Sequence, residues 1–275
     1  MRTLRPLCFG VFFLMLLTAS LRAEPLEVDC LIEPHVLVKI GSPVPGVLDT
    51  VNVDRGDMVK KNQVLATLRS GVERSNMELA KARAEMEGDI EESKARLAYT
   101  DRKQQRMQEL HSKQAVSFEN LDEAQVNRVL ADIALKRAVE SKTLAELDYR
   151  RTVEVLKKMT IYSPINGVVV DRFQSPGEYV EDQPILQVAQ IDPLNVEVIL
   201  SVENRGSLSE GMTASVVPQE PVGGTYQATV TIVDKVVDAA SGTFGVRLEM
   251  PNPGYRINAG IQCKVIFDIG DVGRN

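Results

Sequence analysis

The sequence predicts a multidomain protein of mixed α and β class, in which a long antiparallel α-helical hairpin interrupts a β-domain and a small β-barrel follows. Three observations predict this fold. Two short β-rich segments repeat each other at a constant offset of 121 residues, the stretch between them has helical composition, and residues 191–268 alternate apolar and polar side chains between turn signals. With 275 residues, 44% apolar and 25% charged, the chain is long enough for two or three small domains.

Residues 1–23 have the pattern of a secretory signal peptide. Arg2 and Arg5 precede an apolar run over residues 7–19, and small or polar residues lead to Ala23. A run of this length is too short to span a bilayer as a stable helix, although an uncleaved anchor is the alternative. Cleavage would remove three arginines (Arg2, Arg5, Arg22) and no acid, which moves the formal net charge from -6 to -9. An acidic chain without a basic cluster argues against a nucleic-acid partner.

Cleavage would also remove Cys8 and leave two cysteines, Cys30 and Cys263. Two cysteines in an exported protein can form one disulfide. The alternative is a pair of buried thiols on neighbouring strands.

The β repeat is built around glycines. Gly46 and Gly56 in the first copy correspond to Gly167 and Gly177 in the second, and an acid follows the second glycine of each copy. Both copies are typical of short strands with Val, Ile and Leu on one face. Because a unit of about 30 residues cannot bury a useful core alone, we expect the two copies to pack together.

Between Gly71 and Lys158 the chain contains a single glycine, Gly88, and no proline. This composition favours helix, and the pattern predicts one break, at residues 111–117, where Ser117 is a good N-cap and Val116 with Leu121 has the spacing of a hydrophobic staple. The result is a hairpin with its tip near residues 112–117 and arms of about 40 residues, which reach roughly 60 Å. Two apolar stripes and a seven-residue alanine repeat are the expected contacts between the arms: Leu79, Met86, Ile90, Leu97 and Met107; Val126, Leu130, Ile133, Leu144 and Leu147; Ala124, Ala131, Ala138 and Ala145.

After residue 190 the chain alternates in the manner of β-strands. Turn signals at residues 223–224, 241–242 and 252–254 separate the alternating runs. Several short strands over about 75 residues indicate a small closed barrel or a sandwich.

The chemistry of an active site is missing from the sequence. The two histidines, His35 and His111, lie before the first β copy and near the expected tip, which disfavours a shared metal or nucleophile site. No phosphate loop or dinucleotide fingerprint occurs, and the nine methionines are scattered as core fillers would be. We therefore expect no enzyme activity, no metal and no cofactor.

The duplicated half-motif resembles the biotinyl–lipoyl carrier fold, whose two halves pair about a pseudo-twofold axis. In carriers a short hairpin joins the halves and presents a modified lysine, whereas about 90 residues join them here. Lys157-Lys158-Met159 is only faintly similar to the acceptor motif and falls at a helix end.

A split lipoyl domain with a helical hairpin, followed by a barrel, resembles the periplasmic adaptor subunits (membrane fusion proteins, HlyD-like family) of tripartite efflux pumps of the resistance-nodulation-division (RND) class. The resemblance covers residues 30–268 and includes a barrel pattern at residues 238–247 with Asn252-Pro253 and Gly260. It implies a periplasmic homo-oligomer, arranged as a ring, that links an inner-membrane transporter to a TolC-like outer-membrane channel. It divides the chain into residues 1–23 (signal peptide), 24–70 (entering strand and first lipoyl half), 71–158 (hairpin), 159–190 (second lipoyl half), 191–268 (barrel) and 269–275 (tail).

The same resemblance implies a docking site. Adaptors of TolC-like channels carry Arg, then Leu four residues on, then Ser seven further, and Arg106, Leu110 and Ser117 have this spacing at the expected tip. Two of the three also have structural interpretations, since Ser117 caps a helix and Leu110 can close the hairpin core.

The sequence departs from many RND adaptors after the barrel, where they add a membrane-proximal β-domain and this chain stops at Asn275. This departure leaves the class of transporter open, and two alternatives to the RND adaptor remain. One is an adaptor of an ATP-driven (ABC) exporter or type I secretion system, and the other is a lipoyl or biotin carrier subunit.

Overall fold

The structure is a computed structural model that describes residues 26–267, which form two compact units. One unit spans Val36–Gln190, and the other combines the chain up to His35 with the chain from Ile191 onward. The expected signal peptide and the tail at 269–275 lie outside the described residues.

In the first unit, each copy of the repeat supplies three short strands. The first copy holds β2 (Gly46–Val51), β3 (Met58–Val59) and β4 (Val64–Leu68), and the second holds β6 (Gly167–Arg172), β7 (Tyr179–Val180) and the start of β8 (Pro184–Ser201). Strand β1 (Leu26–Gly41) enters the unit and β5 (Thr160–Tyr162) pairs with β4.

Strands of the first copy pair with strands of the second. β2 pairs with β7, where Gly46 lies opposite Val180, and β3 pairs with β6, where Val59 lies opposite Gly167. Since these pairings are related by the 121-residue offset, the two halves form a pseudo-twofold arrangement, as the repeat predicts. Aliphatic side chains from both halves fill one core, as expected for two units too small to bury a core separately: Ile40, Leu48, Val53, Val59, Leu65, Leu68, Ile161, Val169, Val180, Ile185, Leu186 and Val188.

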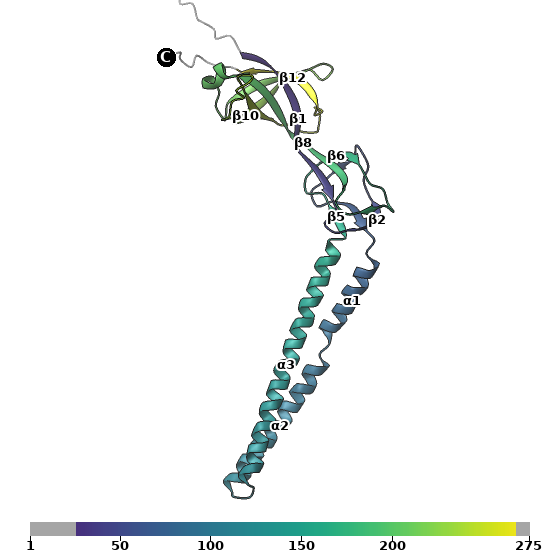
Figure 1. Cartoon of the computed structure of the whole chain (residues 1–275), viewed down its shortest axis with the longest axis vertical. Coiled ribbons are helices and arrows are strands. Elements are labelled where there is room, and N and C mark those ends of the chain that lie inside the picture. The colour runs from purple at the N-terminus through teal and green to yellow at the C-terminus, as the bar shows by residue number, and fades with distance from the viewer. Residues whose placement is uncertain (1–25, 268–275) are drawn as a thin grey trace, which may run out of the picture. The chain divides into compact units, whose positions relative to one another are not determined.

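Between β4 and β5 the chain forms three helices, which we call the helical arm (Figure 1). They are α1 (Gly71–Glu85), α2 (Gly88–Ser112) and α3 (Phe118–Lys157), and both α1 and α2 pack against α3. Among the described residues, no helix has the length and apolar character needed to cross a membrane.

The seam between these helices is made of small side chains. Its buried members are Ala80, Ala84, Thr100, Leu121, Ala124, Ala131 and Thr152. In the alanine repeat of α3, Ala124 and Ala131 are buried, as the sequence predicts, whereas Ala138 and Ala145 are half-buried. The large apolar side chains of the expected stripe on α3 are exposed, as are Leu79 and Met86. The prediction was wrong for these residues because apolar spacing does not tell which of two faces of a helix is covered.

The arm also contains a break that the sequence analysis did not predict. α1 ends at Glu85, and Met86 leaves helical geometry with a ψ of 126° before α2 starts at Gly88. Ala80 and Ala84 face α3, and on an unbroken helix the next residues to face α3 would be 87 and 91. In α2 the residues that point toward α3 are instead Ile90, Leu97 and Thr100. The break therefore corrects a one-residue shift in the apolar pattern.

The second unit is a small barrel. Its strands are the first part of β1, the last part of β8, β9 (Thr213–Pro218), β10 (Tyr226–Val233), β11 (Thr243–Met250) and β12 (Ile261–Phe267), with a short 3-10 helix at Val202–Ser207. The order is β1-β12-β9-β10-β11-β8, and because β1 also pairs with β8 the order closes on itself. Of the two expected alternatives, a barrel and a sandwich, the strand order supports the barrel.

Cys30 on β1 lies directly opposite Cys263 on β12. Their Cα atoms are 4.8 Å apart and a disulfide joins them across 233 positions of sequence. Both cysteines are buried in the barrel core.

The turns of the barrel account for its motif residues. Asp238 accepts hydrogen bonds from the backbone of Ala240 and Ser241, and Gly242 turns the chain with a φ of 67°. The side chain of Asn252, buried to 2% exposure, donates to the carbonyls of Ile191 and Ile257 and accepts from the Ile257 N–H. These residues are therefore structural.

Candidate docking tip of the helical arm

The five residues between α2 and α3 form a tight loop at the far end of the arm (Figure 1). The Ala115 N–H donates to the Leu110 carbonyl at 2.9 Å, and the Gln114 N–H donates to the His111 carbonyl at 2.8 Å. Gln114 adopts a left-handed conformation with a φ of 59°. Nδ1 of His111 lies 3.2 Å from the Val116 carbonyl, so the end of α2 contacts the part of the loop that leads into α3. Hydrogen bonds within the chain, from the backbone and from the His111 ring, thus close the loop.

Ser117 opens α3 as its N-cap. Its hydroxyl oxygen accepts a hydrogen bond from the Asn120 N–H at 3.3 Å, and Glu119 lies in the first turn, where the helix dipole favours an acid. Leu121 is buried and the preceding Val116 is half-buried, as the staple spacing predicts. This capping role is compatible with a docking role, because the Ser117 side chain remains exposed.

The other two members of the expected triplet differ in exposure. Arg106 lies exposed on α2, whereas Leu110, one turn later, is half-buried against the loop. The large apolar surface at the tip is instead Phe118, with 68% of its area exposed. Its ring meets the His111 ring edge-on at 6.1 Å. Phe118 is not among the residues predicted from the sequence, although its place directly after an N-cap serine and outside the seam spacing is a signal of an exposed aromatic residue.

The four glycines of the repeat have separate roles in the β-unit. Gly56 and Gly177 take φ values of 92° and 93° in the turn before β3 and β7, a conformation that other residues adopt only with strain. Gly167 is needed for space, since an added Cβ would lie 2.1 Å from the Ala189 carbonyl oxygen. None of them faces a ligand site in the described part of the chain.

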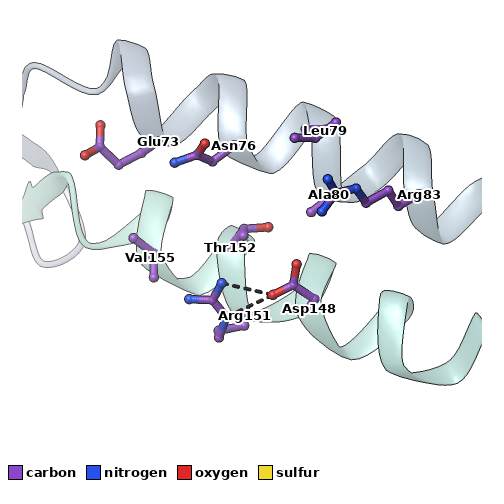
Figure 2. Close-up of a pocket in the computed structure, with 9 residues that line it drawn as sticks. All are labelled: Glu73, Asn76, Leu79, Ala80, Arg83, Asp148, Arg151, Thr152 and Val155. Atoms are coloured by element: carbon purple, nitrogen blue, oxygen red, sulfur yellow. Dashed lines mark hydrogen bonds and ion pairs between the residues drawn. The ribbon is translucent and has the colours of Figure 1, made fainter. Parts of the chain in front are cut away.

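A small polar cavity of roughly 200 Å³ lies between α1 and α3 (Figure 2). Glu73, Asn76 and Arg83 line it from α1, and Asp148 and Arg151 line it from α3. Arg151 donates to Asp148 at 2.9 Å, so these two charges pair with each other and not across the cavity. Within residues 26–267 no group of three or more His, Cys, Asp or Glu side chains could hold a metal ion.

The weak carrier motif lies at the end of α3. Lys157 pairs with Glu154 at 2.7 Å, Lys158 is the C-cap, and Met159 is buried in the core of the β-unit. A carrier lysine needs a protruding turn with a free amine, and this segment is the junction of a helix with a strand.

Two ion pairs connect the α1–α2 segment of the arm with α3. Lys142 on α3 donates to Glu87 at the break, and Arg128 donates to Asp101 at 2.9 Å. The hydrogen bond from Lys142, together with its charge, lowers the pKa of Glu87, and the same bond raises the pKa of Lys142. These pairs fix which residues of the two sides lie level with one another.

Comparison with known proteins identifies a family and several relatives. Residues 36–190 match the family described as CzcB-like, barrel-sandwich hybrid domain. Over 258 residues the chain is 27% identical to the macrolide export protein MacA of Escherichia coli O157:H7, covering 86% of this chain and 65% of that protein. It is 22% identical to the pyoverdine export membrane fusion protein PvdR of Pseudomonas putida, covering 88% and 69%. The chain thus spans about two thirds of the length of these relatives.

Solved structures share the fold. MacA from Actinobacillus actinomycetemcomitans superposes with a TM-score of 0.77 at 21% identity, over 88% of this chain and 78% of that one. The membrane fusion protein Spr0693 from Streptococcus pneumoniae superposes with a TM-score of 0.62 at 15% identity, over 88% and 98%.

Proposed function

Since the chain belongs to the CzcB-like barrel-sandwich hybrid family and is homologous to membrane fusion proteins of export systems, we propose that it is a periplasmic adaptor between an inner-membrane transporter and a TolC-like outer-membrane channel. The role is one of binding and not of catalysis. The cargo of the relatives, macrolides for MacA and pyoverdine for PvdR, makes small molecules the class of substrate that we assign to the complete pump.

The observation that supports this proposal most directly is the tip of the arm. A self-supported loop carries an exposed Arg106, an exposed Ser117 and the exposed ring of Phe118 at the end of long helices. Such a loop needs no partner to fold, yet presents charge, hydroxyl and aromatic surface to one. In the proposal the tip meets the helical ends of the channel, the β-units pack into a ring and the barrel faces the transporter. The expected domain limits, with the arm at 71–158 and the barrel at 191–268, belong to the same proposal.

Replacing Leu110 or Arg106 with Asp tests the docking role. Asp at either position puts a carboxylate into the contact with the channel, which costs free energy when the charge is buried without a partner. We expect export to fall to the level of a strain that lacks the adaptor, with normal abundance. The melting temperature should be unchanged in Arg106→Asp, where the residue is exposed, and slightly lower in Leu110→Asp, where the residue is half-buried. Gln108→Asp is the matched control, because Gln108 is exposed on the same helix and outside the triplet. Normal export by both Leu110→Asp and Arg106→Asp would exclude docking through this triplet.

The class of transporter is the finer part of the proposal. The sequence resemblance implies an RND transporter, and an ABC exporter or type I secretion system uses the same modules. Crosslinking in cells followed by mass spectrometry of the captured inner-membrane protein separates the two. An intact mass equal to that of the unmodified mature chain would at the same time exclude a lipoyl or biotin carrier.

Export of the chain itself is a further prediction. The charged start and short apolar run predict removal of residues 1–23, so the mature protein begins at Glu24 in the periplasm. N-terminal sequencing of the purified protein checks this. A chain that starts at Met1 would instead indicate a retained membrane anchor.

A further inference from the structure

The outer surface of the barrel contains a groove that the proposed function does not use. It has a volume of roughly 910 Å³ and is lined by thirteen residues on or directly beside β1, β8, β9 and β12, all within the barrel unit. Pockets that bind small molecules have volumes of about 300–1,000 Å³, so the groove has room for a drug-sized compound. We call it the barrel groove.

Part of the barrel groove is apolar. Cys30 and Ile32 of β1 lie in the barrel core, so Leu31 between them points outward into the groove, where it is 38% exposed. Ile199 on β8 lines the same groove and is 69% exposed. Val217 on β9 lines it as well and is half-buried. These side chains offer an apolar surface, and its burial under a ligand would favour binding.

The strands beneath the groove are fixed relative to one another. β1 and β12 pair over seven consecutive residues, and the disulfide between Cys30 and Cys263, both of which line the groove, crosslinks the two strands. Between β12 and the end of β9, the Gln219 N–H donates to the Gln262 carbonyl at 2.9 Å. A site with its walls already in place loses little conformational entropy when a ligand binds. The groove is therefore preorganised.

The charged side chains of the groove are mostly acidic. The ionisable residues that line it are three acids and one base: Asp29, Glu33, Glu197 and Lys264. Lys264 donates to Glu27 at 2.6 Å, and Glu197 accepts from Arg247 at 2.5 Å. Both bases at the groove thus already have an acidic partner.

Two carboxylates of the groove, Asp29 and Glu33, take part in no ion pair among residues 26–267. Both are exposed on the outer face of β1, one on each side of Leu31. The pKa of Lys264 is raised first by its hydrogen bond to Glu27 and more weakly by the charge of Asp29, so Glu33 is the more isolated of the two. With the partners of the ion pairs included, four carboxylates stand against two bases, which leaves a formal charge of -2. A field of this sign attracts a cation.

We propose that the barrel groove binds a small amphiphilic cation, with its apolar part on Leu31 and Ile199 and its positive group beside the two carboxylates that lack an ion pair. A free small molecule fits better than a second protein, because stable protein interfaces use about 20–30 residues on each side and thirteen line the groove. The exposed amide side chains of Gln219 and Gln262 supply hydrogen-bond donors and acceptors that orient the ligand. This site lies on the barrel and needs neither the docking tip nor the transporter.

Fluorescence anisotropy with rhodamine 6G, a drug-sized aromatic cation, tests the proposal on the purified mature protein. We expect saturable binding that weakens as the ionic strength rises. Fluorescein, an anionic dye with the same ring system, should bind at least about tenfold more weakly, because the carboxylates repel it. No saturable binding of rhodamine 6G, or equal binding of the two dyes, would overturn the proposal.

Matched variants locate the bound dye. Leu31→Ser removes apolar surface and should weaken binding about three- to tenfold, whereas Ile232→Ser should bind as the wild type does, because Ile232 is 43% exposed on β10 and outside the groove. Asp29→Asn with Glu33→Gln should also weaken binding about three- to tenfold. Its control is Glu210→Gln, at an exposed acid of the barrel unit outside the groove. Because all these residues are exposed, the melting temperatures should stay close to that of the wild type.

The remaining outcomes separate this site from other uses of the same surface. Wild-type affinity in the groove variants would place the dye elsewhere and overturn the proposal. A change in the sedimentation of the Leu31→Ser protein without weaker dye binding would show that the groove is a contact between copies. Leu110→Asp protein should bind the dye normally while its export activity is lost. Loss of dye binding in the groove variants is measured without export, so failure here leaves the docking proposal untouched.

Discussion

Gly46 and Gly167 occupy equivalent places in the two copies of the repeat, yet the surrounding atoms differ. A Cβ on Gly46 would approach Cδ1 of Leu68 at 3.3 Å, and this side chain can move. A Cβ on Gly167 would collide with the backbone of Ala189, which is held in the β6–β8 pairing. The sequence shows both glycines and their equivalence, but it cannot show that only one of them is needed for space, because this depends on which strand passes behind it.

We predict that Gly167→Ala destabilises the protein by at least about 3 kcal/mol, the upper range for overpacking, because a backbone carbonyl must shift. Gly46→Ala should cost less than about 1 kcal/mol, since Leu68 can adjust its rotamer. Gly177→Ala should fall between them at ~1–2 kcal/mol, the cost of a left-handed conformation in open space. Urea unfolding of the three variants checks the order. Equal losses for Gly46→Ala and Gly167→Ala would contradict it.

At the tip, local features could be predicted and tertiary ones could not. The capping role of Ser117 and the burial of Leu121 follow from side-chain to backbone geometry within one turn, which sequence spacing encodes. The exposure of Phe118 and the partial burial of Leu110 depend on how the loop closes over the end of α2. Spacing alone therefore assigned the apolar contact surface to Leu110 and overlooked Phe118.

Among the elements, the helices show the same division. Composition predicts helix throughout 71–158, and the two strand copies and the barrel strands follow from alternation and turn signals. The break at Met86–Glu87 could not be predicted from composition. It arises because the spacing of the apolar residues in α1 and that in α2 are offset by one residue. One continuous stripe through Leu79, Met86 and Ile90 fits the sequence equally well, because the sequence has two apolar faces and α3 covers only one.

The Glu87–Lys142 pair at this break makes a prediction about pH. A carboxyl group with a lowered pKa stabilises the fold above its ordinary value of 4.5 and loses that contribution as the pH falls through its lowered pKa in the fold. Glu87→Gln should therefore lower the melting temperature slightly at pH 7, and this difference should shrink as the pH falls below 4.5. The matched control is Glu109→Gln, whose pair with Lys113 lies within one turn at the end of α2. A constant difference between wild type and Glu87→Gln across this pH range would show that the pair contributes nothing.

Over the whole molecule, strands distant in sequence are paired with one another. β2 and β3 of the first half pair with β7 and β6 of the second, so the arm is an insertion between two halves that pair with each other. In the barrel, β1 pairs with β12 over seven consecutive residues from Leu26 to Ile32. The repeat predicts the first of these pairings. The second could be proposed only from the two cysteines, because nothing in alternating strands tells which of them are neighbours.

The disulfide at this pairing gives the last prediction. A crosslink across 233 positions of sequence restricts the unfolded chain strongly, and removal of a native disulfide typically costs about 2–5 kcal/mol. The Cys30→Ala, Cys263→Ala double variant should therefore lose about 2–5 kcal/mol of unfolding free energy. Dithiothreitol should reduce the melting temperature of the wild-type protein toward that of the double variant and leave the double variant unchanged. Since both cysteines lie in the barrel core, barrel signals should shift more than the helical signal of the arm. A wild-type protein that melts identically with and without reductant, and shows two free thiols on alkylation, would mean that the cysteines are neighbouring buried thiols.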